Sequence, residues 1–210
     1  MIKVFYSSCK KPFTDEKWNQ YIKRVPVAIQ KKINAFKRWE DRHASLIGKL
    51  LLMKTLKRAG YNNQLEGLKF NDYNRPYLDL PIDFNISHSE NLVICALFDK
   101  GTVGVDVEAI KPIALHDFKN TMNEKEWETI HKSSNPLKEF YKYWTIKESV
   151  IKAHGQGLSI NLRDLNIDQE VVMLYNEKWY VSELLIDEKY SSWIAYNIPC
   201  MNIELEQITF

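Results

Sequence analysis

A seven-residue run without a single charged or hydrogen-bonding polar side chain, Leu92–Phe98, restricts the fold more than any other segment. It is far shorter than the roughly 20 apolar residues that a membrane-spanning helix needs. Its length and β-branched content are typical of a strand that is covered on both faces. Lys100 and Gly101 then predict a turn, and residues 103–108 alternate between apolar and polar side chains. We therefore expect a sheet that lies inside a layered structure.

Helical and extended patterns are mixed along the remaining sequence. The spacing of apolar residues and the capping residues predict helices after Thr14 and over residues 35–59, 123–131 and 135–154. Period-two patterns predict further strands over residues 2–6, 83–86, 171–175, 179–183 and 192–198. The mixture predicts an α+β fold in two halves, which we place at residues 1–101 and 102–210.

Charge is distributed unevenly, although the net charge of the 210 residues is only +2. Residues 23–60 contain eleven Lys or Arg and two acidic residues, so 11 − 2 gives +9. Residues 162–210 contain three basic and nine acidic residues, so 3 − 9 gives −6. The basic segment indicates either an anionic ligand or partner, or the solvated face of a helix.

Neither a signal peptide nor a membrane-spanning segment is expected, because the first residues lack a long apolar run. The three cysteines, Cys9, Cys95 and Cys200, are too far apart and too few for a disulfide framework or a zinc site. A reducing, cytoplasmic location is therefore expected.

Two acidic residues, Asp106 and Glu108, alternate with valines in the segment 103–108. Since alternate side chains of a strand point to opposite faces, both carboxylates share one face. Adjacent carboxylates repel each other unless a cation or a proton lies between them. Oxygen ligands without Cys or His favour a hard ion such as Mg²⁺. The alternative is an exposed strand face with two solvated acids.

Two further groups contain side chains suited to chemistry. On the helix predicted over 135–154, Trp144, Glu148 and Lys152 follow one another at four-residue spacing and share one stripe. The alternative is an ordinary surface Glu–Lys pair. The second group, Ser87, His88 and Ser89, ends an apolar strand and has the hydroxyl and imidazole groups that bind phosphate; the alternative is a structural histidine.

Together and in this order, the three groups resemble the 4′-phosphopantetheinyl transferases of the surfactin-synthetase-activating type. That family's pattern is a hydrophobic residue followed by N-I-S-H-S, then G-[VI]-D-[VI]-E, then W-x-x-K-E-[SA]-x-x-K-x-x-G-x-G-L. The matching segments here are residues 84–89, 104–108 and 144–158. Residues 42–48 resemble the family's first helix, and residues 74–77 resemble its adenine-side loop. The resemblance extends over roughly residues 1–165.

The resemblance implies a fold of two similar α+β halves related by a pseudo-twofold axis, with coenzyme A in the cleft between them. The fused form is a monomer that transfers phosphopantetheine from coenzyme A to a serine of an apo acyl or peptidyl carrier protein and releases 3′,5′-ADP. By resemblance, Mg²⁺ is the metal ion and its ligands are Asp106, Glu108 and Glu148. Lys152 contacts the phosphate that carries pantetheine, and the base is Glu148 or Glu126.

The coenzyme A contacts are also implied by the resemblance. The 3′-phosphate would be held by Lys32, Ser45, Ser87 and His88, and Arg75 with Pro76 would flank the adenine. Departures from the family pattern are Ile29, Ala44 and Asn74. The loss of a basic residue at position 29 leaves Lys31 as the candidate for a replacement contact. Carrier proteins of this kind are acidic helical bundles, and residues 117–131 are the expected docking region.

Three other functions are compatible with parts of the pattern. Three carboxylates and a lysine would also suit a Mg²⁺-dependent nucleotide phosphohydrolase, although no P-loop is present. The basic segment 23–60 would suit a nucleic-acid-binding module, although no known nucleic-acid motif accompanies it. A non-catalytic coenzyme A binder is disfavoured by the complete set of carboxylates and Lys152. We expect no nucleic-acid and no membrane partner.

Overall fold

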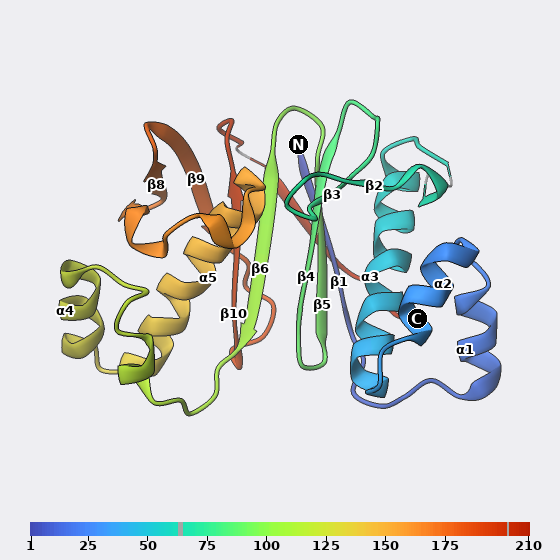
Figure 1. Ribbon diagram of the computed structural model, residues 1–210, viewed down its shortest axis with the longest axis horizontal. Helices are drawn as coiled ribbons and strands as arrows, with labels where there is room; N and C mark the ends of the chain where they lie inside the picture. The colour runs from blue at the N-terminus through green and yellow to red at the C-terminus, as the bar shows by residue number, and fades with distance from the viewer. Residues whose placement is uncertain (63–64, 201) are drawn as a thin grey trace.

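Two antiparallel-rich sheets lie side by side, and each carries one long helix (Figure 1). The computed structural model describes residues 1–62, 65–200 and 202–210. The first sheet has the strand order β11-β1-β5-β4 and the second has the order β6-β10-β9-β8-β7. The long helices are α3 (Trp39–Arg58), which packs on the first sheet, and α5 (Pro136–His154), which packs on the second. The expected α+β fold in two halves is confirmed.

The first half begins with β1, which pairs antiparallel with β5, and β5 pairs antiparallel with β4. Thr14 accepts a hydrogen bond from the backbone of Lys17 and so caps α1, as its position in the sequence predicts. A two-stranded ribbon, β2–β3, overlaps the upper part of this sheet in the view of Figure 1. The elements are β1 (Ile2–Ser8), α1 (Asp15–Ile22), α2 (Val27–Asn34), α3, β2 (Lys69–Phe70), β3 (Pro76–Tyr77), β4 (Asp83–Ser89) and β5 (Leu92–Phe98).

The second half repeats this plan, since its first strand, β6, pairs antiparallel with β10, and β10 pairs antiparallel with β9. Asn135 caps α5 and Pro136 is its first residue; Gly155 ends it with a φ of 86°, which favours glycine. The elements are β6 (Val103–Ala109), α4 (Glu124–Lys132), α5, β7 (Asn166–Asp168), β8 (Val171–Leu174), β9 (Glu177–Glu183) and β10 (Tyr190–Tyr196).

Every residue of β5 is buried, which confirms that this strand is covered on both faces. Val93, Cys95 and Leu97 face the core beneath α3. The intervening Ile94 and Ala96 join a second core between the two sheets. This second core also contains apolar residues of β1, β6 and β10: Ile2, Val4, Val103, Val105, Val107 and Ile194. The two halves therefore share an apolar interior.

Several elements differ from those predicted. The helix expected over residues 35–59 begins only at Trp39, and a separate helix, α2, precedes it. The strand expected over 83–86 continues to Ser89, so the Ser-His-Ser group lies within β4 and does not follow it. The last strand, β11 (Ile203–Gln207), pairs in parallel with β1. The segment 102–210 therefore contributes one strand to the sheet of the first half. No described helix is long and apolar enough to cross a lipid bilayer.

Candidate active site

The carboxylates of β6 lie where this strand runs alongside β4. Asp106 is only 2% exposed and Glu108 is half-buried, whereas Val105 and Val107 on the other face belong to the core between the sheets. The alternation in the sequence therefore predicts the two faces correctly. The alternative of a solvated acidic face is wrong for Asp106.

Lys152 of α5 closes a compact polar network around Asp106. Its ammonium donates hydrogen bonds to Asp106 Oδ1 at 2.5 Å and to Ser87 Oγ at 2.9 Å. The Ser87 hydroxyl donates to the same Asp106 oxygen at 3.0 Å. Ser87 is therefore buried beside the carboxylates, and its hydroxyl is already engaged there. The expected contact of Ser87 with a 3′-phosphate stays a prediction.

Glu108 and Glu148 belong to the same electrostatic group. Burial raises the pKa of the Glu108 carboxyl, and the charge of Asp106 adds to the rise, while Ser89 and Lys152 oppose it. Burial also raises the pKa of Glu148, with Asp106 and Glu108 adding to the rise and Lys152 opposing it. The three carboxylates predicted as metal ligands thus lie close enough to repel one another around a single lysine.

Side chains of β4 complete the hydrogen bonding of the edge strand β6. Every second residue of β4 presents an oxygen to a backbone N–H of β6. These side-chain oxygens take the place of backbone hydrogen bonds, because β6 is an edge strand and no described strand is paired with it on this side. The four pairs are Val103 N to Asp83 Oδ2 at 2.8 Å, Val105 N to Asn85 Oδ1 at 3.1 Å, Val107 N to Ser87 Oγ at 3.4 Å and Ala109 N to Ser89 Oγ at 3.0 Å. We call this set the β4–β6 ladder.

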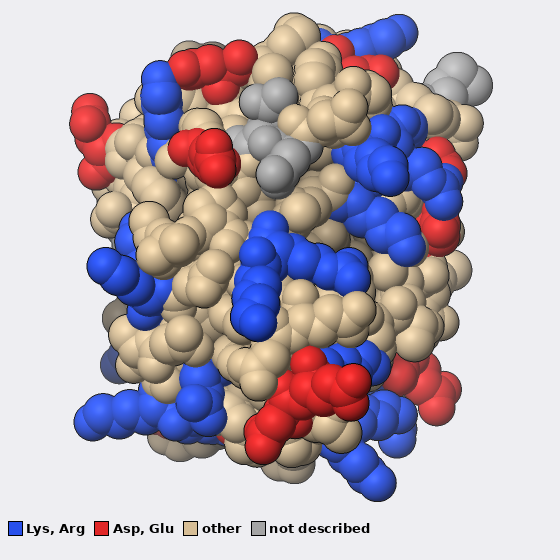
Figure 2. Space-filling view, turned by 90° about the vertical axis from the view of Figure 1, so that its right-hand side faces the viewer, with Lys and Arg blue, Asp and Glu red and all other residues tan. Residues whose placement is uncertain are grey.

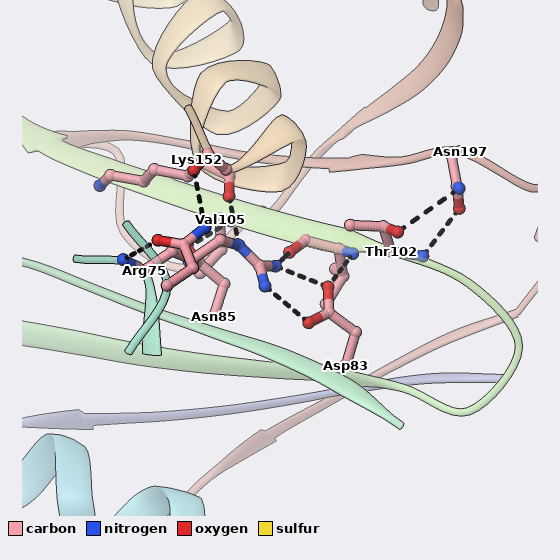
Figure 3. A network of polar contacts seen from close by, with 10 residues as sticks. Arg75, Asp83, Asn85, Thr102, Val105, Lys152 and Asn197 are labelled. Carbon is pink, nitrogen blue, oxygen red and sulfur yellow. Dashed lines mark hydrogen bonds and ion pairs between the residues drawn. The ribbon is translucent and has the colours of Figure 1, made fainter. Parts of the chain in front are cut away.

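Arg75 ties three elements together at one end of the β4–β6 ladder (Figure 3). Its guanidinium donates two hydrogen bonds to the Asp83 carboxylate, at 2.9 and 2.6 Å. It also donates to the carbonyl oxygens of Lys152 at 2.8 Å and Val103 at 3.0 Å. All its nitrogens are therefore engaged in holding β4, β6 and the end of α5 together. Pro76 follows in β3, and the expected adenine contact of both residues stays a prediction.

The residues expected to bind the 3′-phosphate do not share one cavity. Lys32 and Ser45 line one cavity of about 270 Å³ between α2 and α3. Lys31 is exposed and does not line this cavity. His88 is exposed on β4, where it lines a cavity of about 340 Å³ with Asp41 and Ala44. Loss of solvent lowers its pKa, and the charge of Lys152 adds to this while Asp41 opposes it. Ser87, as described above, lies with the carboxylates.

Glu126, the second candidate base, forms a buried ion pair. Its Oε2 accepts from the ammonium of Lys147 at 2.6 Å, and both side chains are at most 5% exposed. Lys147 also donates to the carbonyl oxygens of Thr121 and Leu162. Glu126 further forms a capping box with Asn123 at the start of α4. These contacts join α4 and the residues after 160 to α5, and the role of Glu126 as a base stays a prediction.

Some residues of the site were not singled out from the sequence. The β4–β6 ladder uses Asp83, Asn85 and Ser89, and its signal in the sequence was a polar residue at every second position of residues 83–89. Lys147 had no distinguishing signal, because a lysine on a helix is ordinarily solvated.

The fit of a metal ion depends on Asp106. Its Oδ2 is buried and has no hydrogen-bond partner in the described structure, so one carboxylate oxygen is free to bind a cation. The donors present are hard oxygens, which suit Mg²⁺. No three His, Cys, Asp or Glu side chains in the described ranges form a ready ligand cluster. Lys152 occupies the other oxygen of Asp106, so the carboxylates fit Mg²⁺ only after rearrangement.

The carboxylate–lysine group lies where β6 and α5 of the second half meet β4 of the first half. This arrangement is that of a two-half enzyme whose site lies along the junction of its halves. Comparison with known families agrees with this division. The model of the 4′-phosphopantetheinyl transferase superfamily matches residues 102–197, and the model of the 4′-phosphopantetheinyl transferase N-terminal region matches residues 11–98.

Curated relatives point to the same family. The chain is 36% identical to the 4′-phosphopantetheinyl transferase gsp of Aneurinibacillus migulanus over 71% of this chain and 67% of that protein. It is 31% identical to the 4′-phosphopantetheinyl transferase Sfp of Bacillus subtilis over 79% of this chain and 76% of that protein. The mouse L-aminoadipate-semialdehyde dehydrogenase-phosphopantetheinyl transferase is 25% identical over 87% of this chain and 70% of its own length. The chain belongs to the 4′-phosphopantetheinyl transferase superfamily and is an enzyme of the Sfp type.

Proposed function

We propose that the protein transfers phosphopantetheine from coenzyme A to the serine hydroxyl of an apo acyl or peptidyl carrier protein, with Mg²⁺, and releases 3′,5′-ADP. One observation carries this proposal: Lys152 of α5 is paired with the buried Asp106 of β6, and the charge of Asp106 raises the pKa of both Glu108 and Glu148 after burial has raised it. The carrier's serine is the nucleophile, so the chain itself needs only to bind, orient and move a proton.

Mg²⁺ would be held by Asp106, Glu108 and Glu148 together with phosphate oxygens, and would neutralise charge on the pyrophosphate as its bond breaks. Lys152 would exchange Asp106 for the phosphate that carries pantetheine. Phosphoryl transfer depends mainly on positioning and charge stabilisation, which Lys152 and the β4–β6 ladder would supply. Glu148 is the candidate base, because its raised pKa makes it a better proton acceptor than an ordinary carboxylate.

We further propose a docking surface for the carrier on residues 117–131. A mostly apolar hollow here has a cavity of about 330 Å³ and is lined by Leu115, His116, Lys119, Trp127 and His131. Apolar walls with a lysine and two imidazoles suit an acidic helical carrier. We expect a monomer, since both halves occur in one chain. We also expect a cytoplasmic location.

The experiment is the intact mass of an apo acyl carrier protein and an apo peptidyl carrier domain after incubation with the protein, coenzyme A and Mg²⁺. We expect a gain of one phosphopantetheine that EDTA prevents. The Asp106→Asn variant should lose at least about 100-fold in rate and stay folded, since it removes charge from the proposed metal ligand. No mass gain on either carrier, or wild-type turnover by Asp106→Asn, would contradict the proposal.

A further inference from the structure

A loop of the first half lies against the C-terminal end of α5, which belongs to the second half. The loop, residues 71–75, joins β2 to β3. The side-chain oxygen of Asn71 accepts hydrogen bonds from the backbone N–H of Tyr73 at 2.9 Å and of Arg75 at 2.8 Å. This side-chain turn fixes the shape of the loop from which Asn71 and Arg75 reach α5.

Asn71 and Arg75 cap the end of α5. The last carbonyl groups of a helix have no partner within the helix, and they carry its partial negative charge. Arg75 Nε donates to the Lys152 carbonyl oxygen at 2.8 Å, and Asn71 Nδ2 donates to the Gly155 carbonyl oxygen at 3.1 Å. The first half therefore supplies the cap for a helix of the second half. We call Asn71 and Arg75 the cross-half cap.

Asp83 holds the guanidinium of Arg75 in this position through two hydrogen bonds. The side chains of Arg75 and Asp83 are only 14% and 18% exposed, so water screens the pair weakly. Other basic side chains lie in solvent, since the side of the molecule formed by α1, α2 and α3 carries several groups of Lys and Arg on its surface (Figure 2). A shielded two-pronged pair is stronger and more directional than an exposed one, and it fixes Arg75 in space.

Gly155 makes room for the cross-half cap. A β-carbon at Gly155 would lie 2.8 Å from Arg75 Cδ and 3.6 Å from Asn71 Nδ2. The first distance is too short for two carbon atoms in contact. Arg75 could move aside only by giving up its pair with Asp83. The glycine that ends α5 therefore also admits the arginine that caps it.

Strand β4 holds Lys152 at both ends. Asp83 and Ser87 are four residues apart on β4 and lie on one face of the strand. Asp83 fixes Arg75, which holds the backbone carbonyl of Lys152 (Figure 3). Ser87 accepts a hydrogen bond from the Lys152 ammonium at 2.9 Å. A shift of the last turn of α5 would break these bonds and move the ammonium away from Asp106.

We propose that Arg75, fixed by Asp83 and aided by Asn71, is a positioning residue that sets the place of the Lys152 ammonium for phosphopantetheine transfer. The inference rests on the proposed function, because that function makes the transferred phosphate the partner of Lys152. A displacement of about 1 Å can cost about 100-fold in rate, and phosphoryl transfer depends mainly on positioning. This role acts on the rate of transfer, whereas an adenine contact of Arg75 would act on the affinity for coenzyme A.

The full chain and its variants are compared for kcat with an apo carrier and for coenzyme A affinity by calorimetric titration. Arg75→Met should lower kcat about 10-fold to 100-fold and change the dissociation constant of coenzyme A less than about threefold. Asp83→Asn should act in the same direction, because it removes the charge that holds the guanidinium. Arg75→Lys should recover part of the rate, since it restores a cation beside Asp83. The matched control, Arg58→Met, removes a pair with Glu206 and should leave both quantities unchanged.

A double-variant cycle asks whether Arg75 acts through Lys152. Lys152→Met should itself lower kcat, and the addition of Arg75→Met should lower it by less than about threefold more. All rates are measured well below the melting temperature of each variant, so that they refer to folded protein. A merely structural role for Arg75 predicts that the two losses multiply. Multiplied losses, or a loss of coenzyme A affinity with kcat unchanged, would overturn the positioning role.

Amide hydrogen exchange tests the cross-half cap without activity. The amides of residues 153–156 should exchange at least about 10-fold faster in Arg75→Met than in wild type, because the end of α5 opens more often. Arg58→Met should leave these rates unchanged. A wild-type chain that modifies no carrier would overturn the proposed function, while faster exchange in Arg75→Met would still support the cap. Unchanged exchange in Arg75→Met would overturn the cap whatever the activity.

Discussion

Gly104 of β6 lies directly against the backbone of α5 at Ser149: a β-carbon at Gly104 would be 2.1 Å from the Ser149 carbonyl oxygen. It would also lie 2.4 Å from the backbone nitrogen of Ala153. These are backbone atoms of a helix interior, so they cannot rotate away. The absence of a side chain therefore allows α5 to place Glu148 and Lys152 beside Asp106.

Gly104→Ala should push α5 away from β6 and destabilise the protein by at least about 3 kcal/mol, the upper range for overpacking. Chemical denaturation followed by circular dichroism measures this loss. The control is Gly67→Ala, because the nearest atom to a β-carbon there is Leu78 Cδ2 at 3.9 Å. An unchanged unfolding midpoint for Gly104→Ala would show that the close packing is not required.

The β4–β6 ladder predicts a local effect of removing Asn85. Asn85→Ala leaves the buried N–H of Val105 without its acceptor, which costs about 1–3 kcal/mol. Amide hydrogen exchange should become faster at Val105 and its neighbours in β6. Asn62→Ala, at an exposed position, is the control. Equal exchange rates in wild type and Asn85→Ala would mean that the ladder does not hold β6.

Removing the charge of Glu148 should stabilise the ligand-free protein at high pH. The folded-state pKa of Glu148 lies above its unfolded value of about 4.3, so the charged form is disfavoured by folding. Glu148→Gln should therefore have the higher melting temperature near pH 8. The difference should be about 2–4 °C for each kcal/mol gained in the free energy of unfolding.

The pH profile of this difference provides the decisive comparison. As the pH falls through the raised pKa, wild-type Glu148 takes up a proton, and the advantage of Glu148→Gln should disappear. Thermal denaturation of both proteins from pH 8 to pH 4 gives the profile. The burial of the Glu148 carboxylate would be contradicted if Glu148→Gln melted no higher than wild type at pH 8. It would also be contradicted if the difference in melting temperature grew as the pH fell. Glu183→Gln, on the exposed end of β9, serves as the control.

Breaking the Glu126–Lys147 pair should destabilise the protein strongly. Lys147→Met removes one partner and leaves the buried Glu126 carboxylate uncompensated, which costs about 3–5 kcal/mol. The double variant Lys147→Met with Glu126→Leu should recover much of this loss, because no buried charge remains. Denaturation of both variants measures the difference. Failure of the double variant to recover would indicate that the contacts of Lys147 with Thr121 and Leu162 matter more.

Substituting Glu126 and Glu148 one at a time shows which of the two candidate bases accepts the proton. Glu126→Gln keeps the capping geometry, so we expect it to retain most of its transfer rate per folded molecule. Glu148→Gln should lose at least about 100-fold, a typical contribution of general base catalysis. The rates come from the mass assay with an apo carrier. A larger loss for Glu126→Gln than for Glu148→Gln would make Glu126 the base.

Several features could be predicted from the sequence because they follow from local periodicity and local capping. The alternation of residues 103–108 predicts both faces of β6, and the run Leu92–Phe98 predicts a doubly covered strand. The caps at Thr14 and Asn135 predict two helix starts. Each of these signals involves neighbours in the chain, where the geometry of a helix or strand is sufficient.

Other features were decided only by the tertiary structure, because they depend on partners distant in the chain. The sequence shows Glu126 and Arg75 as charged residues; only the fold pairs Glu126 with Lys147 and closes Arg75 onto Asp83 and two carbonyl groups. Lys147 and Lys31 are both helix lysines in the sequence, yet packing buries the first in an ion pair and leaves the second exposed to water. Residue type and spacing were therefore sufficient to identify the three carboxylates, Lys152 and the family. Burial, which removes water and leaves each charge to its neighbours, decided which of these groups are structural and which are free to bind a ligand.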